Sequence, residues 1–158
     1  ISEIKQHLNI KPVYQAYKIR YQNHFLGHPL ICRAQQYAKV RLFQRGKAEV
    51  SQEAVHEEIL VHTSKIGQLH GVIFHYSFRS LPQVIRKFTY YARLEVPLLQ
   101  KQRIRPTLRH ITIYPLHMFW SIFIEDEGHK DHVWGFLLGV CFMYYEWARY
   151  FFLWKLRK

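Results

Sequence analysis

Two clusters of ionisable side chains lie close together in the middle of the sequence. The first ends in His56, Glu57 and Glu58, and the second is the segment 75–81, HYSFRSL. Neighbouring residues of a strand point to opposite faces, so the two carboxylates are not the facing pair that glycosidases use. One of them is a candidate general base, with His56 beside it to orient the carboxylate or to ligate a metal. Solvated carboxylates and a hydrogen-bonded structural histidine are the simpler interpretation.

The second cluster has the side chains that bind a diphosphate. Arg79 offers forked donors, Lys87 a point charge, and His75 and Tyr76 neutral donors. A helix that begins near Leu81 would add backbone N–H groups. The alternative is an ordinary basic surface with a tyrosine anchored in the core.

The cysteines and histidines give little support for a metal or redox site. Cys32 and Cys141 are far apart, lack CxxC spacing and lie in apolar surroundings, which predicts two buried, reduced thiols. The 11 histidines include no HExxH motif. The closest group, 129–132 (HKDH), falls in a turn, and the acidic run 125–127 is interpreted as solvated.

Composition predicts one folded domain with an anionic partner. The 158 residues suffice for a core, and 49% of them are hydrophobic and 16% aromatic. The net charge of +12 favours nucleic acid, an acidic membrane surface or a phosphorylated ligand. The basic run 101–109 could contact phosphates, but the sequence has no helix-turn-helix, RNP or zinc-finger signature.

Apolar spacing predicts strands in the first part of the chain and helices after it. Ser80 with Pro82 and Gln83 is a helix start, and Pro97 interrupts the apolar stripe that follows. The elements expected before that interruption are a helix at 1–8, strands at 14–25 and 37–43, a continuation at 48–50, a hairpin at 59–74 that turns at 65–68, and a helix from 80.

The C-terminal part is expected to be helical and aromatic. A short apolar helix at 114–124 is followed by a polar turn at 125–131 and by the apolar run 134–154. That run is about as long as the ~20 residues that span a bilayer. Glu146 and Arg149 lie inside it and could pair on one helix face, which favours a partly inserted, interfacial helical hairpin over a span.

The order of several segments resembles a known family. These segments are 40–48 (VRLFQRGKA), 55–57 (VHE), 75–81 (HYSFRSL), and then Lys87 and Tyr91. The chain resembles the C-terminal half of bacterial family 2 glycosyltransferases, specifically the beta-1,4-glucosyltransferases of the lipopolysaccharide or lipooligosaccharide core.

Two further segments add to this resemblance. Residues 23–27 (NHFLG) are similar to the acceptor-side loop of that group. Residues 131–136 (DHVWGF) are similar to a segment in which glycine usually follows the aspartate. His132 replaces that glycine, so a different turn is expected there.

The resemblance implies an α/β fold, namely the C-terminal part of an A-type glycosyltransferase with a short mixed sheet and hairpin, followed by amphipathic, aromatic-rich helices. It implies an acceptor-side half at 1–97 and a basic linker with a membrane-associating helical hairpin at 98–158. The nucleotide-binding half, with its Asp-x-Asp motif and a divalent Mg or Mn, is expected before Ile1. Metal ligands would lie mostly outside this chain, and the chain alone is expected to be inactive.

The resemblance also implies an inverting transfer of a hexose, with glucose as the first candidate. Glu57 is then the candidate base, with His56 beside it. The candidate substrate-binding residues are Arg41, Arg45, His75, Tyr76, Arg79, Lys87 and Tyr91.

The implied partners are a UDP-glucose-like donor, an anionic lipid-linked oligosaccharide and the membrane surface, without nucleic acid. The implied location is peripheral, on the cytoplasmic face of the bacterial inner membrane. A non-catalytic membrane-surface binding module and a basic nucleic-acid-binding domain are the alternatives.

Overall fold

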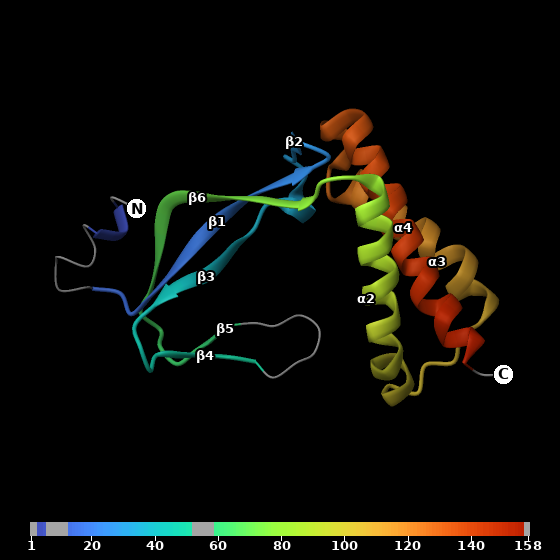
Figure 1. Cartoon of the computed structure of the whole chain (residues 1–158), viewed down its shortest axis with the longest axis horizontal. Helices are drawn as coiled ribbons and strands as arrows, with labels where there is room; N and C mark the ends of the chain where they lie inside the picture. Colours follow the sequence, from blue (N-terminus) through green and yellow to red (C-terminus); the bar gives the residue numbers. More distant parts are fainter. Residues whose placement is uncertain (1–2, 6–12, 52–58, 157–158) are drawn as a thin grey trace. The chain divides into compact units, whose positions relative to one another are not determined.

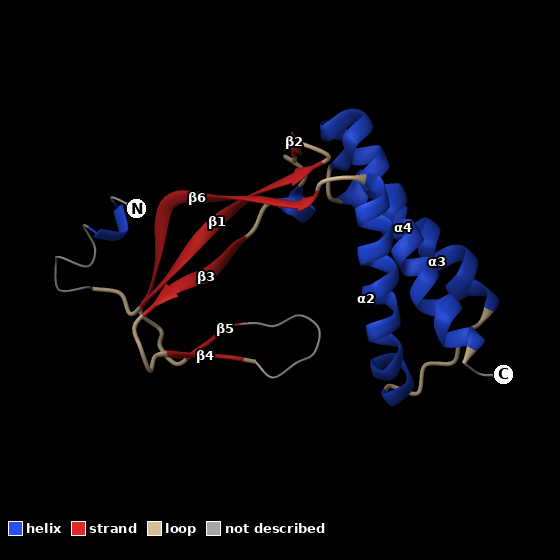
Figure 2. Ribbon diagram, in the orientation of Figure 1, coloured by secondary structure: helices blue, strands red, loops and turns tan. Residues whose placement is uncertain are grey.

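The structure is a computed structural model that describes residues 3–5, 13–51 and 59–156. The chain divides into two compact units. Unit 1 comprises Ile1–Gln22 and Gln36–His75, and unit 2 comprises Asn23–Gln35 and Tyr76–Lys158. In the described residues, unit 1 is built mainly of strands and unit 2 mainly of helices (Figures 1 and 2).

The main sheet of unit 1 is formed by three strands. These are β1 (Ala16–Phe25), β3 (Ala38–Phe43) and β6 (Ile66–Phe78), of which β1 and β6 continue into unit 2. β3 pairs antiparallel with β1 through a bulge, and β6 pairs with the other side of β1. Backbone hydrogen bonds join Gln15 to Lys65 at one end of β1 and Leu26 to Phe78 at the other, so β1 and β6 run in the same direction (Figure 1).

The structure confirms the predicted strands at 14–25 and 37–43 and the continuation at 48–50. The prediction of a hairpin at 59–74 is wrong. The short strand β4 (Ala48–Val50) pairs antiparallel with β5 (Ile59–Val61). β6 pairs with β1 instead. The chain turns before β6, and residues 66–68 of the expected turn form the start of β6.

Gly67 explains this error. A Cβ built on Gly67 would lie 2.7 Å from the Tyr14 ring and 3.1 Å from the Tyr17 ring. The glycine therefore marks a strand position against which two tyrosine rings pack, not a turn. From sequence, a glycine among turn-forming residues cannot be distinguished from one that allows close packing.

Unit 1 also includes a short helical turn at residues 3–5. The Glu3 carboxylate accepts hydrogen bonds from the backbone N–H groups of His70 (2.7 Å) and Gly71 (3.0 Å) on β6. These two bonds lower the pKa of Glu3 to about 2. The remainder of the helix expected at 1–8 lies outside the described residues.

Unit 2 consists of three long helices with short connecting elements. Its helix α4 packs against both α2 and α3. The strand β2 (His28–Pro29) pairs with the end of β1. The helical elements are η1 (Arg33–Gln35), α2 (Leu81–Lys101), α3 (Leu108–Trp120), η2 (Ser121–Glu125), η3 (Gly128–Asp131) and α4 (His132–Lys155).

The predicted start of α2 is confirmed, whereas its interruption at Pro97 is wrong. Ser80 is the N-cap residue, although its side chain makes no capping hydrogen bond. The helix continues through Pro97 to Lys101. Proline removes one hydrogen bond, and the buried residues on either side, Val96 and Leu99, keep the helix packed. Residues 97 and 98, the expected boundary between the two halves, both lie inside α2.

Helix α3 begins at Leu108, earlier than residue 114, where the sequence predicted its start. Thr107 and His110 form a capping box, in which the Thr107 N–H donates to His110 Nδ1 at 3.1 Å. The helix therefore starts at Leu108 and takes in part of the basic run 101–109. A capping box with histidine in place of Glu or Gln is a weak signal in sequence.

The core of unit 2 joins its helices to the segment 23–35. One cluster of buried side chains includes Phe25, Leu30, Val84, Phe88 and Leu138. A second cluster, Val96, Leu99, Tyr150 and Leu153, joins α2 to α4. No helix in the described part of the chain has both the length and the apolar character that a membrane span requires.

Candidate functional site

The two candidate catalytic residues, His56 and Glu57, lie outside the residues that the structure describes. The candidate substrate-binding residues are all described. They fall in both units: Arg41, Arg45 and His75 in unit 1, and Tyr76, Arg79, Lys87 and Tyr91 in unit 2. Each set is therefore considered separately.

In unit 2, two of the candidate residues line a pocket of about 310 Å³. Tyr76 and Phe78 come from the end of β6, Arg79 follows it, and Leu26 and Gly27 come from the turn after β1. Gly27 has a φ of +87°, and this left-handed conformation favours glycine in a tight turn. No carboxylate is among these lining residues.

Aromatic stacking holds one wall of this pocket. The Tyr76 ring stacks on the buried His24, with ring centroids 4.3 Å apart. Tyr76 is still 49% exposed. The tyrosine is thus partly exposed and not the core anchor of the simpler interpretation.

Lys87 extends the positive charge beside the pocket. Its Nζ lies 5.3 Å from the centroid of Phe78, a lining residue, and 5.8 Å from that of Tyr91. The Arg79 N–H donates to Gln83 Oε1 at 2.9 Å at the start of α2, and Arg79 is exposed. Unit 2 therefore places Tyr76 and Arg79 in one pocket with Phe78, and Lys87 lies between Phe78 and Tyr91.

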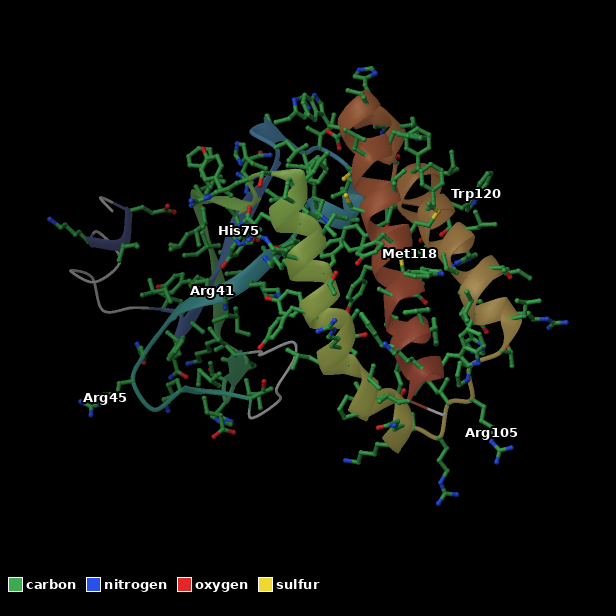
Figure 3. The ribbon with its side chains drawn as sticks, turned by 45° about the vertical axis from the view of Figure 1, so that its right-hand side comes forward. Arg41, Arg45, His75, Arg105, Met118 and Trp120 are labelled. Carbon is green, nitrogen blue, oxygen red and sulfur yellow. The ribbon has the colours of Figure 1, made fainter. Side chains whose placement is uncertain are left out.

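In unit 1, a second cationic and aromatic group lies on the sheet. The Arg41 Nε donates to the Tyr21 hydroxyl at 2.5 Å, and its guanidinium lies 5.6 Å from the Tyr21 ring centroid. The rings of Tyr37 and His75 lie 5.2 and 5.5 Å from that of Tyr21. Arg45, in the turn after β3, is exposed and away from this group (Figure 3).

An ionic network between α2 and α4 was only partly predicted. The expected pair is confirmed: Arg149 Nη1 donates to Glu146 Oε2 at 3.2 Å. Sequence analysis missed Glu95, whose carboxylate lies 3.3 Å from Arg149 Nε, without hydrogen-bond geometry, and accepts a short hydrogen bond from the Tyr145 hydroxyl. The signal was present, because Glu95 falls in the buried stripe of α2.

Burial dominates the electrostatics of this network. It outweighs the attraction of Arg149 and raises the pKa of Glu146 above the ordinary 4.5. Burial and the Glu95 carboxylate also raise the pKa of Tyr145, so the phenol is neutral and can donate. These groups make an internal stabilising network, with no opening to a ligand among the pockets described here.

Asp131 is a second buried carboxylate, and it has a structural role. It is 1% exposed and accepts hydrogen bonds from the backbone N–H groups of Ile31 (2.9 Å) and Cys32 (2.8 Å). It therefore fixes the segment 23–35 against α4. Burial and the neighbouring Asp131 raise the pKa of the Cys32 thiol to about 12, which removes it as a nucleophile at neutral pH.

His132 adopts a backbone conformation that favours glycine. His132 has φ 50° and ψ −127°, angles that favour glycine. A turn that differs from the family's Asp-Gly turn therefore stays a prediction. This backbone conformation costs a histidine about 1–3 kcal/mol of conformational free energy.

The buried thiols expected from sequence are confirmed, since Cys32 and Cys141 are buried and free. Among the described residues, no group of three His, Cys, Asp or Glu side chains could hold a metal ion. The resemblance implies that the ligands of the divalent metal lie mostly outside this chain.

Comparison with models of protein families found no match, and comparison with curated proteins and with solved structures found no significant match. The resemblance to family 2 glycosyltransferases therefore depends on the segments quoted from the sequence.

Proposed function

We propose that this chain is the acceptor-binding part of an inverting glycosyltransferase that adds a hexose, with glucose as the first candidate, to lipopolysaccharide core or a related cell-surface glycan. The reaction type rests on the family resemblance. The ligand class is supported by one observation, the pocket of unit 2 lined by Tyr76, Phe78 and Arg79 with Lys87 beside it.

This pocket has the side chains that an anionic sugar requires. A partly exposed tyrosine can stack on the apolar face of a sugar ring. An exposed arginine can bind a phosphate through two parallel hydrogen bonds, and a nearby lysine adds a point charge. Since no carboxylate is among the described residues that line the pocket, its charge selects phosphorylated over neutral saccharides.

The proposed reaction assigns Glu57 as the general base, with His56 beside it. The Glu57 carboxylate removes the proton of the acceptor hydroxyl, whose oxygen attacks the anomeric carbon of a UDP-glucose-like donor while UDP departs. Arg41, Arg45, His75 and Tyr91 remain candidate contacts to the diphosphate or to acceptor phosphates. In the complete enzyme, Mg or Mn would neutralise charge on the departing diphosphate.

The proposal assigns only the acceptor side to these 158 residues, because they contain no Asp-x-Asp sequence. The acceptor would be an anionic lipid-linked oligosaccharide at the cytoplasmic face of the bacterial inner membrane, where the chain is peripheral. The net charge of +12 supports attraction to such a surface.

The decisive experiment is calorimetric titration of the chain with a deacylated, phosphorylated lipooligosaccharide core. Arg79→Gln is expected to weaken binding about tenfold, because a charge-assisted hydrogen bond contributes about 1.5–3 kcal/mol. Arg86→Gln is the matched control, since Arg86 is an exposed arginine of α2 that does not line the pocket. Equal affinity for the enzymatically dephosphorylated core would contradict the proposed ligand class.

A turnover assay tests the assignment to the acceptor side. The chain is incubated with UDP-glucose, Mg or Mn and the same core oligosaccharide, and released UDP is measured. No turnover is expected from this chain alone. Glucose transfer would show that the donor site is present within the 158 residues and would overturn the division of roles.

A membrane-surface binding module is the second candidate function, and the surface of α3 favours it. Ile113, Leu116 and Trp120 follow one another at helical spacing and are 54%, 63% and 54% exposed. Arg105 and Arg109 lie before and at the start of this stripe (Figure 3 labels Arg105 and Trp120). Apolar and aromatic side chains flanked by arginines fit an anionic lipid surface.

Vesicle sedimentation separates the two candidates. Leu116→Glu is expected to reduce binding to vesicles that contain phosphatidylglycerol, while leaving oligosaccharide binding unchanged. Gln100→Glu, at an exposed position of α2, is the control for added charge. If Leu116→Glu binds vesicles as well as Gln100→Glu does, the stripe is not a membrane-binding surface.

A further inference from the structure

A second pocket lies at the other end of α2, where this helix packs against the last turns of α4. Its volume is about 380 Å³. Arg93 and Val96 of α2 line one side, and Phe152, Lys155 and Leu156 at the end of α4 line the other. No residue here belongs to the pocket at Tyr76 and Arg79.

Both cations of this pocket are available to an anion. Among the residues that the structure describes, neither Arg93 nor Lys155 forms an ion pair with a carboxylate. The nearest acid along α2, Glu95, is buried and paired with Arg149 instead. The guanidinium of Arg93 lies 4.8 Å from the centroid of the Phe152 ring, which orients it beside the apolar wall.

The remaining wall is apolar and only partly covered. Val96 is buried, Phe152 is half-buried, and Leu156 is 64% exposed at the rim. A small inorganic anion would bind the cations and leave this rim in water. A ligand with an apolar tail would also cover Leu156, at about 25 cal/mol for each Å² of apolar surface removed from water.

We propose that this pocket binds a phosphorylated amphiphile, in which the phosphate contacts Arg93 and Lys155 and the apolar tail lies against Phe152 and Leu156. Arginine binds phosphate through its planar fork, and lysine contributes a point charge. The shared chemistry is a phosphate group joined to an aliphatic chain. This site is independent of the proposed glycan pocket.

The test is calorimetric titration of the whole chain with dihexanoyl phosphatidic acid below its micellar concentration. Two probes separate the sources of affinity. Dihexanoyl phosphatidylcholine has the same tails without a net charge, and inorganic phosphate has the charge without tails. The phosphatidic acid is expected to bind about tenfold more tightly than either, because both the charged and the apolar contacts are needed.

Three variants locate the site. Arg93→Gln and Lys155→Gln are each expected to weaken phosphatidic acid binding about tenfold through loss of a charge-assisted hydrogen bond. Leu156→Ser is expected to weaken phosphatidic acid binding without changing the affinity for inorganic phosphate. Arg86→Gln, two helical turns before Arg93, is the matched control and should bind as the unmodified chain does.

Circular dichroism of each variant establishes that unit 2 remains helical, so that a loss of binding reports the pocket. Equal affinities for phosphatidic acid and phosphatidylcholine would overturn the role of the cations. Equal affinities for phosphatidic acid and inorganic phosphate would overturn the role of the apolar wall. Unchanged binding in both Arg93→Gln and Lys155→Gln would place the ligand elsewhere.

Discussion

Arg41 on β3 and Arg149 on α4 both lie over a tyrosine ring, 5.6 Å from the Tyr21 centroid and 5.2 Å from the Tyr150 centroid. Their surroundings differ. Arg41 is exposed on the sheet of unit 1. Arg149 has a side chain that is 22% exposed and lies within 4 Å of two buried glutamates of unit 2.

The difference lies in what each cation contributes. An exposed cation beside an aromatic ring adds little to stability, because water competes for it, and it stays available to a ligand. A buried cation between two carboxylates is needed for the fold, since its removal leaves buried charge without compensation. The same residue types therefore lie exposed on the sheet in unit 1 and form a structural network in unit 2.

The largest effect is expected for Arg149→Met. It leaves Glu95 and Glu146 without a cation, which should lower the free energy of unfolding of unit 2 by about 3–5 kcal/mol. Urea denaturation followed by tryptophan fluorescence measures this, because all 4 tryptophans of the chain lie in unit 2. Arg86→Gln is the exposed control. A loss below about 1 kcal/mol for Arg149→Met would show that the network behaves as a surface ion pair.

A smaller loss is expected for Tyr145→Phe. The variant removes the hydroxyl that donates to Glu95 and should cost about 1–3 kcal/mol, since it leaves a buried acceptor with one donor fewer. Tyr90→Phe is the matched control, because Tyr90 is 60% exposed on α2. Equal stability of the two variants in urea would contradict a stabilising hydrogen bond to Glu95.

The two units are expected to respond to acid in opposite directions. In unit 2, Glu146 faces Glu95, His117 and Arg149, and its folded-state pKa is raised above 4.5. As pH falls, the Glu146 carboxylate binds its proton in the folded protein at a higher pH than in the unfolded protein. Glu146 therefore stabilises unit 2 fully below pH 4.5, and this stabilisation is lost as pH rises through the raised pKa. The pKa of Glu3 is lowered from 4.5 to about 2. Glu3 therefore stabilises unit 1 fully above pH 4.5, and this stabilisation is lost as pH falls toward 2.

Separate probes measure the two responses. Tryptophan fluorescence follows unit 2 in urea at several pH values, and Glu146→Gln should flatten its dependence above pH 4.5. Amide exchange of His70 and Gly71 follows unit 1, and Glu3→Ala, which removes both acceptor oxygens, should lower their protection at neutral pH. A stability of unit 2 that rises with pH above 4.5, and that Glu146→Gln abolishes, would contradict the sign given for Glu146.

The smallest effect is expected for Arg41→Met. Because Arg41 is exposed, the loss in stability of unit 1 should stay below about 1 kcal/mol. Amide exchange in β1 and β3 measures it. A loss as large as that of Arg149→Met would remove the distinction between the two arginines and assign Arg41 to the fold.

Much of the fold could be predicted from local pattern. Alternation predicted strands at 14–25 and 37–43, which are observed as β1 and β3, and the Ser80 start and the apolar stripe predicted α2. The pairing of the strands was harder to predict from sequence. β6 pairs with β1, a strand some 50 residues earlier, and the residue pattern of a strand does not identify its partner. Of the site, the sequence placed Arg79 just before α2 and Lys87 within it, whereas the stacking of Tyr76 on His24 required the tertiary structure.

The sequence by itself determined the charge, the aromatic content and the periodicities, since these depend on residue type and spacing. It also determined that Glu146 and Arg149 share a helix face, because residues three apart on a helix are neighbours. Only the tertiary structure decided which charges are buried. Burial depends on how distant segments pack, and it distinguishes Arg149, held between Glu95 and Glu146, from Arg41 on an exposed sheet.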